Sequence, residues 1–153
     1  MRYRRLTPAD WRTWRDIRLT ALRSDPDAFG STLAREQEYD EARWRELMAP
    51  RNGVKVIAVE TSGSGAAEPV ALVAGVPHED DAETLYLYSM WVRPEFRRQG
   101  VGEAMVANVL AWAREHGWTR VELRVFRDNP VARRLYARLG FVGEGEVMDH
   151  PLS

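Results

Sequence analysis

The feature that most constrains this chain is a glycine turn, Arg97-Arg98-Gln99-Gly100-Val101-Gly102, which separates an apolar segment from an amphipathic one. The preceding residues, 84–92, are aromatic and apolar enough to predict a buried strand. The following residues, 101–115, carry apolar side chains at helical spacing and predict a helix. Because glycine has no Cβ, the backbone at this junction can approach a ligand closely. The free N–H groups at a helix start favour an anion, and we expect a pyrophosphate there.

Other interpretations of the turn fit less well. A Walker phosphate loop requires Gly-Lys followed by serine or threonine, and this turn has neither the lysine nor the hydroxyl. A dinucleotide fingerprint would begin at Gly100, with Glu122 as the ribose-binding acid. However, Met105 occupies the position of its third glycine, and Glu122 lies near the start of its strand. A glycine pair alone is also compatible with a tight turn that binds nothing, so the assignment needs a second motif.

Residues 125–141 supply the second motif. They predict a strand end and a helix capped by Asn129 or Asp128, with Pro130 in its first turn and Gly140 after its end. Arg-x-x-Gly-x-Gly followed by Asn-x-x-Ala-x-x-Leu-Tyr-x-x-x-Gly-Phe, in this order and spacing, resembles the GNAT superfamily of acyl-CoA-dependent N-acyltransferases. The resemblance covers residues 84–141 strongly. It covers the N-terminal part more loosely, where residues 25–31 look like the first-helix exit of many small-molecule members.

The order of elements predicts a mixed α/β fold with a mostly antiparallel central sheet flanked by helices. We expect strands at 3–6, 54–60, 70–76, 84–92 and 120–126, a helix that starts at Thr7 and runs to Arg23, and a short helix capped by Asp40. The last of these strands returns parallel to its predecessor through the helical crossover. The resemblance implies that strands four and five splay apart and hold the pantetheine arm of acyl-CoA in the wedge.

Length and composition narrow the class of protein. The 153 residues fit a single domain spanning 1–153, and residues 61–67 are expected to form a flexible hairpin loop. A net charge of −1 does not favour nucleic acid as a partner. The absence of cysteine excludes a thiolate nucleophile and a disulfide framework. We find no apolar run of membrane-spanning length, no signal-peptide core and no metal-ligand spacing. We therefore expect a cytoplasmic protein without a metal.

The resemblance implies acetyl-CoA as co-substrate and assigns its binding to three segments. The main chain of the fourth strand would bind the pantetheine arm as a peptide binds an open sheet edge, at Met90, Trp91 and Val92. The turn and helix start would bind the pyrophosphate, at Arg97, Arg98, Gln99, Gly100, Val101, Gly102 and Glu103. Asn129 would contact the arm or serve only as a helix cap. Arg133 belongs to a basic group on the last helix, with Arg134 and Arg138, that suits the phosphates of coenzyme A.

The implied reaction is transfer of an acetyl group from acetyl-CoA to a primary amine of a small molecule by direct attack. No acyl-enzyme forms, so the missing cysteine is compatible with it. Tyr136 matches the position of the proton donor to the departing thiolate, and its ring is also expected to pack. Two further functions stay open: acetylation of a protein or peptide amine, and a CoA-binding regulatory domain without turnover.

The chain departs from well-studied members at the general base. The two positions on the fourth strand that carry a base in those members are Tyr86 and Tyr88 here, and a phenol titrates near pH 10, too high for this task. Four other side chains are weaker candidates: Glu36, Glu38, Glu83 and His150. The aromatic residues Phe29, Tyr86, Tyr88 and Trp91 suggest an acceptor with an apolar or aromatic part.

The C-terminus is a second departure. Only twelve residues follow Phe141, enough for one strand and at most a stub, whereas the family usually closes its sheet with two strands. One edge of the wedge is therefore either left open or covered by a partner chain, as a homodimer would do.

Overall fold

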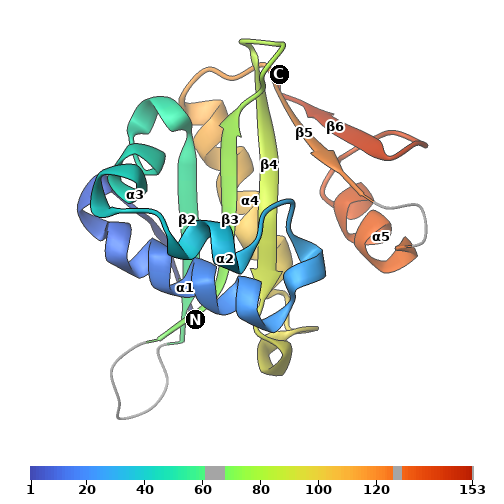
Figure 1. The fold of residues 1–153 in the computed structure, drawn as a ribbon. Helices are drawn as coiled ribbons and strands as arrows, with labels where there is room; N and C mark the ends of the chain where they lie inside the picture. The colour runs from blue at the N-terminus through green and yellow to red at the C-terminus, as the bar shows by residue number, and fades with distance from the viewer. Residues whose placement is uncertain (61–67, 126–128, 153) are drawn as a thin grey trace.

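The computed structural model describes residues 1–60, 68–125 and 129–152, which form one six-stranded sheet with helices on both of its faces (Figure 1). The strands are β1 (Arg2–Arg5), β2 (Val54–Val59), β3 (Pro69–Pro77), β4 (Thr84–Val92), β5 (Arg120–Arg124) and β6 (Val147–Pro151). The α-helices are α1 (Trp11–Ser24), α2 (Leu33–Gln37), α3 (Glu41–Leu47), α4 (Val101–Glu115) and α5 (Pro130–Arg138). Short 3₁₀ turns lie at Pro8–Asp10, Pro26–Ala28, Pro50–Asn52 and Pro94–Phe96. The expected mixed α/β fold is confirmed.

The strands lie in the sheet in their sequence order, and every neighbouring pair is antiparallel except β4 and β5. These two parallel strands pair only from Thr84–Arg120 to Tyr86–Glu122. Beyond Tyr86, β5 diverges from β4 and carries β6 away with it (Figure 1). The predicted splay of the fourth and fifth strands is therefore confirmed, and six further residues of β4 border the wedge without a partner in β5.

Helices α1, α2 and α3 cover one face of the sheet, and α4 covers the opposite face, while α5 lies with β5 and β6 on the far side of the wedge (Figure 1). The crossover from β4 to β5 passes through α4, as the sequence order predicts. Because β2 and β3 have helices on both faces, all six residues of β2 and six of the nine in β3 are buried. Such strands have continuous apolar runs rather than alternation.

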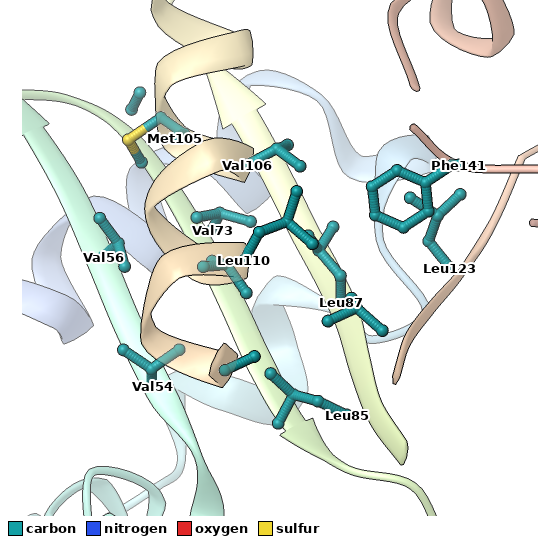
Figure 2. Close-up of a cluster of buried hydrophobic side chains, with 14 of the residues drawn as sticks. Val54, Val56, Val73, Leu85, Leu87, Met105, Val106, Leu110, Leu123 and Phe141 are labelled. Carbon is teal, nitrogen blue, oxygen red and sulfur yellow. The ribbon is translucent and has the colours of Figure 1, made fainter. Parts of the chain in front are cut away.

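The larger core lies between α4 and the sheet and extends across to β5 and the end of α5. Figure 2 shows its side chains converging from β2, β3, β4 and α4 on one side, with Leu123 and Phe141 on the other. The labelled members are Val54, Val56, Val73, Leu85, Leu87, Met105, Val106, Leu110, Leu123 and Phe141. Phe141 is 2% exposed and Leu123 is 1% exposed, so the splayed half of the sheet is joined to the main half by apolar packing.

A second core lies under α1 and α3 on the other face. Trp11, Trp14 and Ile17 recur at helical spacing on α1 and pack with Trp44 of α3 against the sheet. The expected helix start is confirmed at Thr7, which is the N-cap with Pro8 in the first turn, and the Asp10 carboxylate accepts the Thr7 backbone N–H at 2.8 Å. That first turn, Pro8–Asp10, is a 3₁₀ turn. The α-helix itself begins at Trp11, because Asp10 lies outside α-helical geometry at φ −92° and ψ 17°.

Other boundaries differ slightly from expectation. Helix α2, capped by the Thr32 hydroxyl, was not expected, because five residues are too few for a helical period to be recognised. The expected linker 61–67 and the expected end of the fifth strand at Phe126 lie outside the described residues, as does Asp128. Asn129 is the cap that the structure shows, since its side chain accepts the Ala132 N–H at 3.1 Å.

The C-terminal segment forms one strand, as its length predicts. β6 pairs antiparallel with β5 over five residue pairs, and Val142 adds a single bridge to Asp149. β6 is thus an edge strand, and its coverage by a second copy stays a prediction. Among the described residues, no helix is long and apolar enough to cross a bilayer.

Candidate active site

The glycine turn has the backbone geometry that its sequence predicts. Gly100 is the N-cap of α4 and has a φ of 82°, in the left-handed region that glycine adopts readily. It has no side chain to occupy the first N–H groups of the helix, and α4 makes no side-chain cap there. An α-helix leaves these N–H groups without intrahelical partners. The start of α4 is therefore a main-chain anion site, strengthened by the positive end of the helix dipole.

Gly102 serves a different purpose, which is close packing. A Cβ built at this position would lie 2.8 Å from Cε of Met90 on β4 and 3.8 Å from Cδ1 of Leu135 on α5. The absence of a side chain thus brings the start of α4 close to both walls of the wedge.

A cavity of about 750 Å³ opens in front of this turn, and it is named the cofactor cavity after the ligand that the sequence predicts there. It lies between the end of β4, the start of α4 and the first turns of α5. Nine of the predicted cofactor-binding residues line it: Met90, Trp91, Val92, Arg97, Arg98, Gly100, Gly102, Glu103 and Asn129. The remaining lining residues are Asp25, Phe96, Val131, Ala132, Arg134, Leu135 and Arg138.

Three predicted residues are not in that lining. Val101 is 3% exposed and belongs to the core below the turn. The Gln99 amide donates to the Glu95 carbonyl at 3.1 Å, and the Arg133 guanidinium donates to the carbonyls of Gly143 and Gly145. The arginine of α5 that reaches the cofactor cavity from the same turn is Arg134, one position later.

The arginines of the cofactor cavity fall into two groups. Arg97 is held in place, because its Nε donates to the Val92 carbonyl at 2.8 Å and its Nη2 lies 3.2 Å from Asp25 Oδ2. Asp25 also accepts the Trp91 indole N–H at 2.6 Å, and this bond is the main cause of the lowered pKa of its carboxyl. Arg138 pairs with Glu103.

Arg98 and Arg134 line the same cavity and form no ion pair within the part of the chain that the structure describes. No carboxylate in the described part of the chain therefore neutralises these two guanidinium groups.

A bulge in β4 marks where the cofactor cavity ends along this strand. The register between β3 and β4 shifts between the Leu72–Trp91 and Ala74–Tyr88 pairs, and Ser89 in this interval has a φ of 62°. A non-glycine residue in the left-handed region is uncommon and is held by its surroundings. The bulge turns the β4 main chain out of the regular ladder where the strand borders the wedge.

A buried ion pair from α1 and α2 contacts this bulge. Arg18 Nε and Nη2 each donate to a different carboxylate oxygen of Glu36 at 2.9 Å, and Arg18 Nη1 donates to the Ser89 hydroxyl. Both side chains are almost fully buried, at 8% and 5% exposed. Sequence analysis missed Arg18, although a charged residue four positions after Trp14 and four before Leu22, on the apolar face of its helix, was a usable signal.

A second cavity, of about 600 Å³, lies on the other side of the bulge and is called the acceptor cavity below. Its lining is Arg18, Phe29, Gly30, Ser31, Tyr86, Leu87, Tyr88, Ser89, Arg124, Val125 and Glu146. Three of the four aromatic residues that suggested an apolar acceptor are among them. The fourth, Trp91, lines the cofactor cavity instead. The two cavities therefore use consecutive parts of β4, residues 86–89 and 90–92.

The proton-transfer residues predicted from sequence are less well supported by geometry. Tyr136 packs its ring edge-on against Phe141 with a 5.8 Å centroid separation, and it lines neither cavity described above. Burial raises the pKa of its phenol, so the hydroxyl stays protonated at neutral pH, as a proton donor requires.

The four candidate bases do not gather at the acceptor cavity. Glu36 is occupied by Arg18, and neither Glu38, Glu83 nor His150 is in the lining. Burial raises the pKa of both Tyr86 and Tyr88, which makes them still weaker bases. The acidic residue that the structure brings to the lining of this cavity is Glu146, which lies in the segment before β6 and which sequence analysis did not single out.

Comparison with known proteins identifies the family. The model of the Acetyltransferase (GNAT) family matches residues 11–141, which is most of the chain. This chain belongs to the GNAT family of acetyltransferases. It is 34% identical over 80 residues to human N-acetyltransferase 8, covering 50% of this chain and 35% of that protein. It is 36% identical over 81 residues to rat N-acetylaspartate synthetase, covering 53% and 26%. The matched part is thus about a third or less of the length of these relatives.

Solved structures share the fold of this GNAT protein over nearly its whole length. A GNAT acetyltransferase from Streptococcus pneumoniae superimposes with a TM-score of 0.80, at 16% identity and 99% coverage of both chains. The ribosomal-protein-alanine N-acetyltransferase of Brucella melitensis gives 0.73, at 20% identity, covering 99% of this chain and all of that one. Diaminobutyrate acetyltransferase EctA of Paenibacillus lautus, in complex with L-2,4-diaminobutyric acid and coenzyme A, gives 0.62, at 22% identity and coverage of 91% and 74%.

Proposed function

We propose that this protein, as a single N-acetyltransferase domain, transfers the acetyl group of acetyl-CoA to a primary amine of a small molecule. The observation that carries this proposal is the meeting of two cavities at the β4 bulge. One is bounded by a helix start and unpaired arginines, and the other is lined by aromatic side chains. A thioester placed at Ser89 and Met90 would be reachable from both sides.

The residues of the cofactor cavity suit coenzyme A. The N–H groups at the start of α4, with Arg98 and Arg134, would bind its phosphates. The main chain of Met90, Trp91 and Val92 borders the wedge and would bind the extended pantetheine arm, with Asn129 on the opposite wall. Trp91 and Arg97 are fixed by Asp25, so this wall of the cavity is formed before the ligand arrives.

The chemical step is direct attack. The neutral amine nitrogen forms a bond to the thioester carbonyl carbon, the carbon–sulfur bond breaks, and the sulfur leaves as thiolate. The Tyr136 hydroxyl would donate the proton that the thiolate takes up. The proton lost by the amine would leave through water in the acceptor cavity, because no histidine lines that cavity and its phenols titrate too high.

Release of free coenzyme A in the presence of pooled amines tests the proposal. The purified protein should release CoA from acetyl-CoA at least about tenfold faster with small primary amines than without them. Release with peptide amines alone would indicate a protein acetyltransferase. Tight acetyl-CoA binding with no release by either pool would indicate a regulatory CoA-binding domain.

A further inference from the structure

The charges around the acceptor cavity define a class of acceptor, given the proposed function. Arg124, on β5, lines the cavity and has no carboxylate partner in residues 1–60, 68–125 or 129–152. Its side chain is on the same strand face as Glu122, toward the β4 tyrosines, and its positive charge acts on the Tyr86 phenol. An arginine of this kind at the wall of a cavity is suited to binding a carboxylate.

The other arginine of the lining is already neutralised. Arg18 forms its bidentate pair with Glu36 and donates to Ser89, so its charge is balanced within the protein. Arg124 is therefore the cation that an acceptor can pair with.

A second observation also indicates a missing hydrogen-bond partner. The Ser31 hydroxyl oxygen is buried and, among the described residues, is the buried side-chain polar atom without a hydrogen bond. Ser31 lies in the acceptor cavity lining, beside Phe29 and Gly30. A buried hydroxyl without a partner is costly, and an oxygen atom of a bound ligand would satisfy it.

The levels of these residues along β4 and β5 indicate which end of a ligand would face the cofactor cavity. Extending the β4–β5 register past Tyr86–Glu122 brings Tyr88 level with Arg124 and Ser89 level with Val125. Glu146 is at the same level as Val125, because the Val125 N–H donates to the Glu146 carbonyl at 2.7 Å. Positive charge thus lies one strand position farther from the cofactor cavity than the bulge, a rise of about 3.3 Å.

We propose that the acceptor is an amino acid whose carboxylate binds Arg124 while its amine faces the β4 bulge at Ser89. Phe29, Tyr86 and Tyr88 would contact its side chain, which favours an apolar or aromatic one. Polyamines fit this arrangement poorly, since Glu146 is the one unpaired acid among the described lining residues.

The test compares acceptors that differ only in the carboxylate. The twenty proteinogenic amino acids and the same amino acids as carboxamides are each pooled and assayed for CoA release at equal concentration. We expect kcat/KM at least about tenfold higher for the acids. The amines of the carboxamides are less basic, so a larger fraction of them is in the reactive neutral form at neutral pH. Without a carboxylate-binding group, the carboxamides should therefore react at least as fast as the acids.

Three variants assign the preference to one side chain. Arg124→Gln should reduce the ratio of acid to amide to about one, whereas Arg124→Lys should keep a preference for acids. Arg120→Gln is the matched control, because Arg120 lies on the same face of β5 outside the cavity, and this variant should retain the wild-type ratio. Thermal unfolding of each variant confirms that it is folded.

Two outcomes would overturn the inference alone: equal or better use of the amides by the wild-type protein, or a wild-type ratio in folded Arg124→Gln. If neither these pools nor other small amines cause CoA release from a protein that binds acetyl-CoA, the proposed function fails instead.

Discussion

The two cavities share one strand but draw their residues from the chain in different ways. Nine of the sixteen residues that line the cofactor cavity come from one continuous stretch, residues 90–103, which contains the end of β4, the glycine turn and the start of α4. The residues that line the acceptor cavity come from α1, the segment before α2, β4, β5 and the segment before β6. A cavity of the first kind can therefore be recognised from a short motif, whereas one of the second kind depends on how distant segments pack.

The difference also appears in how charge is balanced. In the cofactor cavity, exposed ion pairs hold Arg97 and Arg138 while Arg98 and Arg134 stay available. Below the acceptor cavity, the ion pair is buried and supports a bulge. Changes on the acceptor side should therefore affect stability, and changes on the cofactor side should affect binding.

Breaking the buried pair should give the largest loss of stability. Glu36→Gln leaves the Arg18 guanidinium buried without a counter-charge, and we expect a loss of about 3 kcal/mol or more in the free energy of unfolding. Urea denaturation measures it. Glu38→Gln, two residues later and exposed, is the control and should change stability by less than about 0.5 kcal/mol. Equal stability of both variants would mean that the pair contributes nothing.

A double variant separates stability from positioning. Arg18→Met combined with Glu36→Met removes both charges, and such replacements are often neutral for stability. A drop in kcat with retained stability would show that the Arg18–Ser89 contact positions the bulge. Unchanged kcat would make the pair purely structural.

On the cofactor side, the substitution expected to cause the largest loss of binding is Gly102→Glu. The new side chain would start 2.8 Å from the Met90 methyl and place a carboxylate where phosphate is expected. We expect acetyl-CoA affinity to fall by at least about a hundredfold, or about 3 kcal/mol, with the fold retained. Titration calorimetry measures the affinity. Gly145→Glu adds the same charge at an open position outside the cavity and should bind normally. Normal binding by folded Gly102→Glu would place the cofactor elsewhere.

Lys55, on β2, tests how charge is balanced near Arg18. It is 3% exposed, and burial together with the positive charge of Arg18 lowers its pKa to about 8. Because the unfolded value is about 10.4, the unfolded state binds more protons between these values, so stability should rise from pH 8 to pH 10. Below pH 8 the charged group destabilises the fold by about 3 kcal/mol.

Lys55→Met should therefore be more stable than wild type at pH 7 by about 2 kcal/mol, and the gain should vanish near pH 10. Denaturation of both proteins across this range measures it. Lys55 is the only lysine of the chain, so its titration can also be followed directly by NMR. A pH-independent difference between the two proteins would mean that Lys55 has an ordinary pKa.

Tyr136→Phe should change only one measured quantity, kcat. If the hydroxyl protonates the thiolate, kcat should fall by roughly ten- to a thousandfold while acetyl-CoA affinity stays unchanged. The ring contact with Phe141 does not involve the hydroxyl, so stability should change little. Steady-state kinetics and calorimetry give both numbers. Wild-type turnover in the variant would limit Tyr136 to packing.

The sequence alone determined the fold class, the pairing of β2 through β5 and the position of the turn at the start of α4. These depend on local signals: apolar segments of strand and helix period, the left-handed glycine at Gly100 and the Asn129 cap. Each acts over a few residues, so each is readable without knowing the rest of the chain.

Only the tertiary structure decided which charged residues join the aromatic residues Phe29, Tyr86 and Tyr88 at the acceptor cavity. Arg18 and Glu36 are 18 residues apart, Ser89 is 71 residues from Arg18, and Arg124 and Glu146 reach the cavity from a fifth strand and the segment before the sixth. No local period or motif links these residues. They come together because β5 leaves β4 after three residue pairs and because α1 and α2 pack over the bulge, which are consequences of long-range packing.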